Sequence, residues 1–145
     1  MIYAISGNYM SYGTGKLFRW WDTGGDKLSG GQQLDPGWEI YKFAFASNDG
    51  VFYAVDSIGK LWRYHDTGTN NLGARMQISA GWENYKTAFA TSNGVIYGID
   101  WKGNLWWWHD TGSGSLSDGR LIGPGWGDYR IILATSDGRF YGIKE

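Results

Sequence analysis

The 145-residue sequence has no cysteine, only two prolines and two histidines. Without cysteine, a disulfide framework, a thiolate metal site and a cysteine nucleophile are all excluded. The sequence is also poor in charge of either sign, because 13 basic and 14 acidic residues are scattered singly and leave a net charge of −1. Nucleic acids and anionic membranes require a clustered positive field. The composition therefore argues against both as partners and points to no cofactor.

Long apolar runs are missing as well, and no stretch approaches the roughly 18 residues of a membrane span. The N-terminal Met-Ile-Tyr-Ala-Ile-Ser-Gly-Asn lacks the basic segment and long apolar run of a secretory signal. We expect a soluble chain without membrane insertion, and both a secreted and a cytoplasmic location stay open. Abundant residues are glycine (24), tryptophan (10) and tyrosine (10). This mixture suits short twisted strands joined by tight turns.

An internal repeat with a constant step of 44 residues is the strongest signal in the sequence. Gly-Trp recurs at residues 37, 81 and 125, and Asp-Thr-Gly begins at residues 22, 66 and 110. Ser92-Asn93-Gly94 predicts a type I′ hairpin turn. Alternating patterns around it predict four strands in one unit, at residues 85–90, 95–99, 105–109 and, more weakly, 120–122. A period of roughly 40–45 residues with several short strands is typical of β-propeller blades.

We therefore predict an all-β fold, a single β-propeller segment of four-stranded antiparallel blades. Its three repeats cover about 1–50, 51–94 and 95–138, a closing strand covers 139–145, and about six residues are inserted within 7–15. The first blade is expected to lack its innermost strand. Because propellers have about four to eight blades, three cannot close a ring. We expect a homodimer in which Tyr129–Ala134 completes the partner's first blade, giving a six-bladed ring.

Aromatic residues also follow the repeat and are expected to fill the space between stacked blades. These residues form two equivalent series, Phe18, Trp62 and Trp106 in one and Trp20, Tyr64 and Trp108 in the other.

One segment resembles a known repeat. Gly81-Trp82-Glu83-Asn84-Tyr85-Lys86, followed by Asn93-Gly94-Val95-Ile96-Tyr97, is similar to the tachylectin-2 family, whose units read Gly-Trp-x-Asn/Asp-aromatic-Arg/Lys and then Asn-Gly-x-Leu-Tyr. All three units match, over nearly the whole chain. The resemblance implies a β-propeller lectin that binds glycans bearing N-acetylglucosamine or N-acetylgalactosamine (GlcNAc or GalNAc). It also implies one site per blade, in clefts between adjacent blades.

The Gly-Trp segments supply the groups that such a sugar requires. A pyranose needs an aromatic surface for its C–H face and polar groups for its hydroxyls and acetamide. An alternative role for the tryptophans is to act as wedges that lock one blade to the next. An alternative role for the basic residues at positions 42, 86 and 130 is to cap sheet ends or to pair with a carboxylate. The candidate ligand-binding residues are Trp38, Trp82, Trp126, Asn84, Asp128, Tyr85, Tyr129, Lys42, Lys86 and Arg130.

Catalytic motifs are not evident, and we expect a protein that is not an enzyme and holds no metal. The triplets starting at Asp22, Asp66 and Asp110 share letters with the aspartic-protease motif, but each follows a predicted strand and fits a turn. His65 and His109 lack a second histidine in their units to complete a metal site. A multivalent lectin is the leading hypothesis. A protein-interaction propeller without a sugar site is the alternative, and a glycosidase or lyase in the central channel is the weakest.

Overall fold

The computed structural model describes residues 2–6, 15–48, 50–69 and 72–144. Within these ranges the chain forms thirteen strands and two single-turn 3-10 helices, η1 (Trp38–Ile40) and η2 (Trp82–Asn84). The strands are β1 (Ile2–Ser6), β2 (Lys16–Trp20), β3 (Gln32–Pro36), β4 (Tyr41–Ala46), β5 (Val51–Asp56), β6 (Leu61–His65), β7 (Met76–Ser79), β8 (Tyr85–Ala90), β9 (Val95–Asp100), β10 (Leu105–His109), β11 (Arg120–Gly123), β12 (Tyr129–Ala134) and β13 (Phe140–Lys144). The six-residue insertion expected within 7–15 falls almost wholly outside the described residues.

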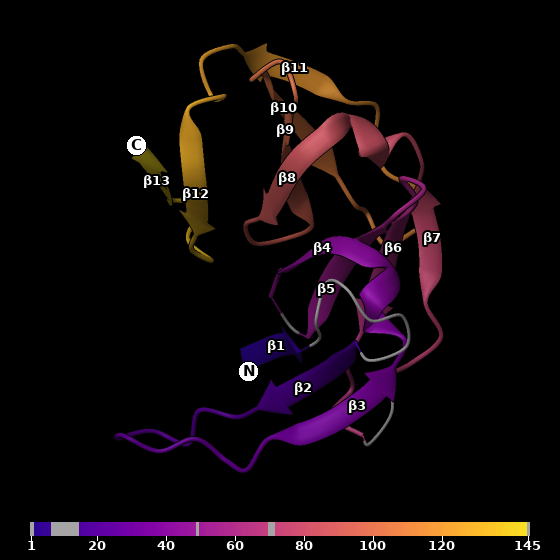
Figure 1. The fold of residues 1–145 in the computed structure, drawn as a ribbon, viewed down its shortest axis with the longest axis vertical. Coiled ribbons are helices and arrows are strands. Elements are labelled where there is room, and N and C mark those ends of the chain that lie inside the picture. Colours follow the sequence, from indigo (N-terminus) through magenta and orange to yellow (C-terminus); the bar gives the residue numbers. More distant parts are fainter. Residues whose placement is uncertain (1, 7–14, 49, 70–71, 145) are drawn as a thin grey trace.

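The strands form four antiparallel sheets that succeed one another in an open arc (Figure 1). The first sheet has the order β1-β2-β3, the second β4-β5-β6-β7 and the third β8-β9-β10-β11, and β12 and β13 form a C-terminal hairpin. The all-β prediction is confirmed, with two complete four-stranded units. The two complete sheets begin at Tyr41 and Tyr85, just after the Gly-Trp segments. The predicted repeat boundaries at residues 51 and 95 therefore fall between the first and second strands of these sheets. The closed ring and the blade count stay predictions.

The turn chemistry agrees with the sequence. Asn93 and Gly94 have φ values of 60° and 73°. Positive φ at both central residues is the mark of the predicted type I′ turn. Each Asp-Thr-Gly triplet forms the expected turn, in which the carboxylate accepts the N–H of the glycine two residues later, at Gly24, Gly68 and Gly112. No helix among the described residues is long and apolar enough to cross a membrane.

A separate hydrophobic core lies between each pair of neighbouring sheets. The second and third sheets enclose the largest one, in which Tyr53, Leu61, Trp82, Ile96 and Trp108 are buried. Two further cores join the first sheet to the second and the third sheet to the C-terminal hairpin. The predicted packing between sheets is confirmed for Tyr64 and Trp108, with Trp62 and Trp106 packed against the same cores. Phe18 and Trp20, on the first sheet, are half-buried.

Asp100 ties the β9–β10 turn to a core tryptophan. Its Oδ1 accepts hydrogen bonds from the backbone N–H groups of Lys102 and Asn104. Its Oδ2 accepts hydrogen bonds from the side-chain N–H groups of Asn104 and Trp106. Partial burial alone would raise the pKa of Asp100, but these hydrogen bonds outweigh it and lower the pKa to about 2.

This pKa predicts an acid-sensitive contribution to stability. Because the folded-state pKa is below the unfolded value, the stabilisation is complete above about pH 4 and is lost as the pH falls towards about 2. We expect Asp100→Asn to be less stable than wild type at pH 7, with the difference shrinking on acidification. Urea denaturation at pH 7 and pH 3 measures this. A constant difference at both pH values would contradict the assignment.

Candidate functional site

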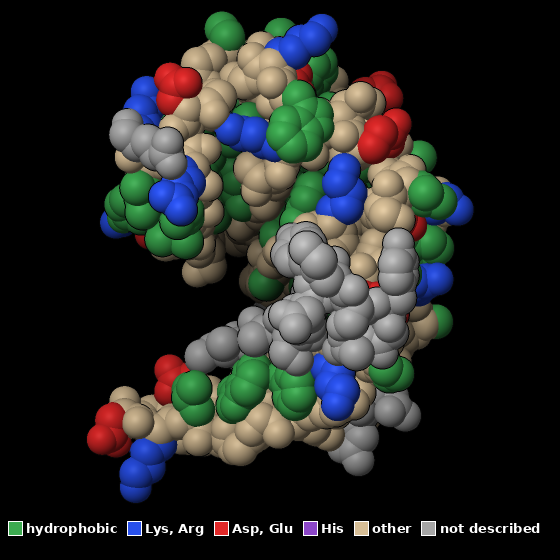
Figure 2. All heavy atoms as spheres, viewed as in Figure 1, with side chains coloured by type: hydrophobic (Ala, Val, Ile, Leu, Met, Phe, Trp, Pro, Cys, Tyr) green, Lys and Arg blue, Asp and Glu red, His purple; other side chains and the backbone are tan. Residues whose placement is uncertain are grey.

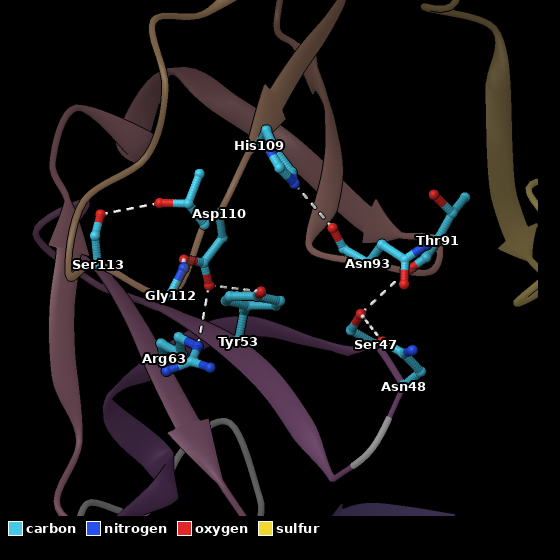
Figure 3. Close-up of polar contacts among 11 residues, drawn as sticks. Ser47, Asn48, Tyr53, Arg63, Thr91, Asn93, His109, Asp110, Gly112 and Ser113 are labelled. Atoms are coloured by element: carbon cyan, nitrogen blue, oxygen red, sulfur yellow. Dashed lines mark hydrogen bonds and ion pairs between the residues drawn. The ribbon is translucent and has the colours of Figure 1, made fainter.

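A polar pocket of about 160 Å³ lies where the second and third sheets meet (Figure 3). The second sheet contributes the β4–β5 turn, β5 and β6, and the third sheet contributes its β8–β9 turn and the end of β10. Its lining includes Ser47, Asn48, Tyr53, Arg63, Asp110, Thr111 and Gly112. The residues come from both sheets, so the pocket exists only because the two pack together.

Asp110 is the anchor of this pocket. Its Oδ2 accepts the hydroxyl of Tyr53 at 2.9 Å, and its Oδ1 accepts the N–H of Gly112 at 2.8 Å. Arg63 Nε lies 3.0 Å from Oδ2, although its N–H is not aligned with that oxygen. The Asp110 side chain is 2% exposed and that of Arg63 is 24% exposed. The carboxylate is therefore held in place while the guanidinium borders the open space.

Tyr53 is held as a neutral hydrogen-bond donor. Burial, and then its hydrogen bond to Asp110, raise the pKa of Tyr53 above the ordinary value of a tyrosine. Its phenol therefore stays protonated at neutral pH and keeps donating to the carboxylate.

The preceding junction, between the first and second sheets, uses the equivalent residues differently. Arg19 and Asp66 form an ion pair in which both side chains are fully buried. The same guanidinium donates to the side chain of Gln32 and to the carbonyl oxygens of Gly68 and Thr69. Arg19 is therefore committed to structure, whereas Arg63 lines a pocket.

A second cavity, of about 210 Å³, lies among the ends of the first strands of the sheets. It is lined by small and polar residues at the ends of β4, β8 and β12, and Ser47 Oγ donates to the carbonyl oxygen of Thr91 across it at 2.9 Å. Ala46, Ala90 and Ala134 occupy the last position of these strands. Small side chains therefore line this cavity at the ends of the strands.

The predicted tryptophans lie mainly in the cores. Trp38 and Trp82 are buried, and Trp126 is half-buried against the core of the third sheet and the hairpin. The backbone N–H groups of Trp82 and Trp126 donate to the carbonyl oxygens of Gly59 and Gly103 at 2.9 Å. Trp38 and Trp82 therefore present no open face for stacking, and the wedge role accounts for both.

The remaining predicted residues are spread over the surface near these wedges. Asn84 and Asp128 are exposed, and the Asn84 side chain donates to the carbonyl oxygen of Gly81. Lys86 donates hydrogen bonds to the carbonyl oxygens of Gly127 and Tyr129. This contact matches the alternative role of the basic residue, the capping of a sheet end. Lys42 and Arg130 are exposed, whereas Tyr85 and Tyr129 are half-buried beside Trp82 and Trp126. None of these residues lines the Asp110 pocket, and their role in binding stays a prediction.

Sequence reasoning missed the partners of Asp66 and Asp110. It assigned these aspartates to turns, which is correct, but the same carboxylates also bind an arginine of the preceding sheet. A signal existed, because Arg19 and Arg63 share the 44-residue step of Asp66 and Asp110.

Comparison with known proteins agrees with the repeat architecture. The family model for tachylectin matches residues 2–118 and again residues 71–145, so the two matches together cover almost the whole chain. No curated protein matches the sequence. Tachylectins are a family of lectins. The overlapping matches reflect the repeat, because one family model can align in more than one register. The chain belongs to the tachylectin family.

Proposed function

We propose that this protein is a multivalent lectin and that the Asp110 pocket binds the polar edge of a sugar. The observation that carries the proposal is the fixed carboxylate beside a partly exposed guanidinium, at a sheet junction of a tachylectin-family chain. The guanidinium that this carboxylate fixes can donate to the hydroxyl oxygens of a sugar, and the side chains of Ser47 and Asn48 can accept from its hydroxyl groups. Neighbouring hydroxyls of a pyranose present both functions on one edge.

The ligand class that we propose is an N-acetylated hexosamine, GlcNAc or GalNAc, as the family resemblance implies. An acetamide needs one donor for its carbonyl oxygen and one acceptor for its N–H. Arg63 can supply the donor, and the β4–β5 turn supplies acceptors at Ser47 and Asn48. The pocket volume of about 160 Å³ suits a single sugar unit rather than an extended chain.

Repetition gives the proposed lectin its avidity. The junction of the first and second sheets is filled by the buried Arg19–Asp66 pair, so the matching sites are the Asp110 pockets of further chains in an assembled molecule. Linked weak sites bind clustered glycans much more tightly than one site binds a free sugar.

Calorimetric titration with GlcNAc and with GalNAc tests the function and its place. We expect binding by wild type and a loss of about 5- to 150-fold in affinity for Asn48→Ala and for Arg63→Met, since removed hydrogen bonds are worth roughly 1–3 kcal/mol. The double variant Asn84→Ala/Asp128→Ala, which alters the Gly-Trp segments, is the matched control and should bind like wild type. Circular dichroism verifies the folding of each variant.

The other outcomes are equally informative. Loss of binding in the Asn84→Ala/Asp128→Ala variant alone would return the sugar site to the Gly-Trp segments. Wild type that binds neither sugar would contradict the proposed ligand class. If the protein also bound no glycan on an array, the alternative hypothesis of a protein-interaction propeller would be favoured over a lectin.

A further inference from the structure

An apolar surface is exposed on the C-terminal hairpin and on β11, the edge strand of the third sheet. Its side chains lie on β11, β12 and β13 and are 45–58% exposed: Ile122, Ile131, Leu133, Tyr141 and Ile143. We call these five residues the hairpin face. Figure 2 shows hydrophobic side chains over the hairpin and over the first sheet, on either side of the open gap in the arc.

Equivalent positions in the preceding repeats are buried. Leu34 and Ile78, which correspond to Ile122, are 7% and 5% exposed, whereas Ile122 is 58% exposed. Val55 and Ile99, which correspond to Ile143, are completely buried. The side chains are of the same kind, so the difference comes from the neighbouring sheet on the C-terminal side. The first and second sheets each have a four-stranded sheet there, whereas the third has only the two strands of the hairpin.

The first sheet carries the matching surface. Tyr64 and Trp108 each pack into the core shared with the preceding sheet. Trp20 holds the same repeat position on β2, is only half-buried, and lies beside Phe18 with 5.8 Å between ring centroids. The first sheet therefore presents the type of face that covers a preceding sheet elsewhere in the chain.

We propose that the first sheet of a second copy of this chain covers Ile122 on the third sheet, and that its second sheet covers Ile131 and Leu133 on β12. The contact is reciprocal, because each copy has one hairpin face and one first sheet, and it closes as a twofold dimer. A second copy fits because its contacts repeat those already made between sheets within the chain.

Strand registers specify how the copies join. β1 pairs with β2 as β5 pairs with β6, with Ala4 opposite Phe18 where Ala54 lies opposite Trp62. β12 pairs with β13 as β4 pairs with β5. β1 and β13 therefore occupy the same repeat position. In the dimer, β12 pairs with the partner's β1, with Ile132 opposite the partner's Ala4. The partner's β1 thereby replaces β13 as the neighbour of β12.

The new junction differs in charge from the two within the chain. Trp107 stands at the repeat position of Arg19 and Arg63, and would face the partner's Asp22. No arginine stands at that repeat position, although Arg120 on β11 lies over the Trp107 ring at 5.4 Å, and we expect burial of apolar surface to drive the association. We expect the dimer to persist in 1 M salt, because screening weakens charge pairs rather than apolar contacts.

Light scattering after size-exclusion chromatography at tens of micromolar tests the surface. Wild type should have the mass of two 16.3 kDa chains, and Ile122→Asp should have the mass of one, with an unchanged circular dichroism spectrum. Ile58→Asp is the matched control, because Ile58 is 69% exposed in the β5–β6 turn, and it should remain a dimer. A single-chain mass for wild type, or a two-chain mass for Ile122→Asp, would overturn the proposal.

Cross-linking tests the strand pairing, which is simple in a chain without cysteine. Ala4→Cys with Ile132→Cys should give a covalent dimer on a non-reducing gel, since directly opposed strand positions lie close enough for a disulfide. Tyr3→Cys with Ile132→Cys is shifted by one residue, which turns the side chain to the other face, and should stay uncross-linked. A wild-type dimer with no cross-link in the first pair would overturn the pairing.

Discussion

Trp82→Ala is expected to lower the free energy of unfolding by about 3–5 kcal/mol, the range for a buried aromatic replaced by alanine. Trp82 is 1% exposed and contacts Tyr85 and Trp108 at ring-centroid distances of 5.0 and 4.7 Å. It belongs to the core that joins the second and third sheets, so its loss leaves a cavity between them. Urea denaturation measures the change.

Trp101→Ala is the matched control for this experiment. Trp101 is 68% exposed, and its indole N–H donates to the carbonyl oxygen of Glu83. Its loss should cost less than about 1 kcal/mol, since one exposed hydrogen bond is at stake. Similar costs for the two variants would show that Trp82 is not the wedge between sheets.

Arg19→Met is expected to cost about 3–5 kcal/mol, because removing one partner of a buried ion pair leaves an uncompensated charge. Arg19 and Asp66 join the first sheet to the second with both side chains fully buried. The first sheet should therefore lose its attachment, and urea denaturation should show a lower midpoint or a separate early transition.

Arg63→Met provides the comparison at the next junction. Arg63 is 24% exposed beside Asp110, and Tyr53 and Gly112 continue to donate to that carboxylate. We expect a smaller cost, of about 1–2 kcal/mol. Equal costs for the two arginines would contradict the distinction between a structural arginine and one that lines a binding pocket.

The fold could be predicted largely from the sequence because each repeat carries its own local signals. The strand predicted at 85–90 is β8, and the one predicted at 105–109 is β10. The Asn93-Gly94 turn between β8 and β9 has the predicted backbone conformation. These features depend on residues near one another in the chain, which alternation and turn chemistry reveal directly.

The pocket could not be predicted in the same way, because it depends on how neighbouring repeats meet. Arg63 and Asp110 are separated by more than one repeat, and alignment of the repeats shows which residues are equivalent but not which ones touch. The burial of Trp82 has the same cause. From the sequence alone, the tryptophan of a Gly-Trp segment fits two roles equally well, stacking on a sugar and packing as a wedge between sheets. Only the packing of the sheets on both sides of it shows which role it has.

Backbone amide chemical shifts during a titration with N-acetylglucosamine test whether the Asp110 pocket binds the sugar. We predict that saturable shifts cluster at Asn48, Gly94, Thr111 and Gly112, on both sides of the Asp110 pocket. Shifts confined to residues 81–85 and 125–129, or no saturable shifts with either N-acetylated sugar, would contradict it.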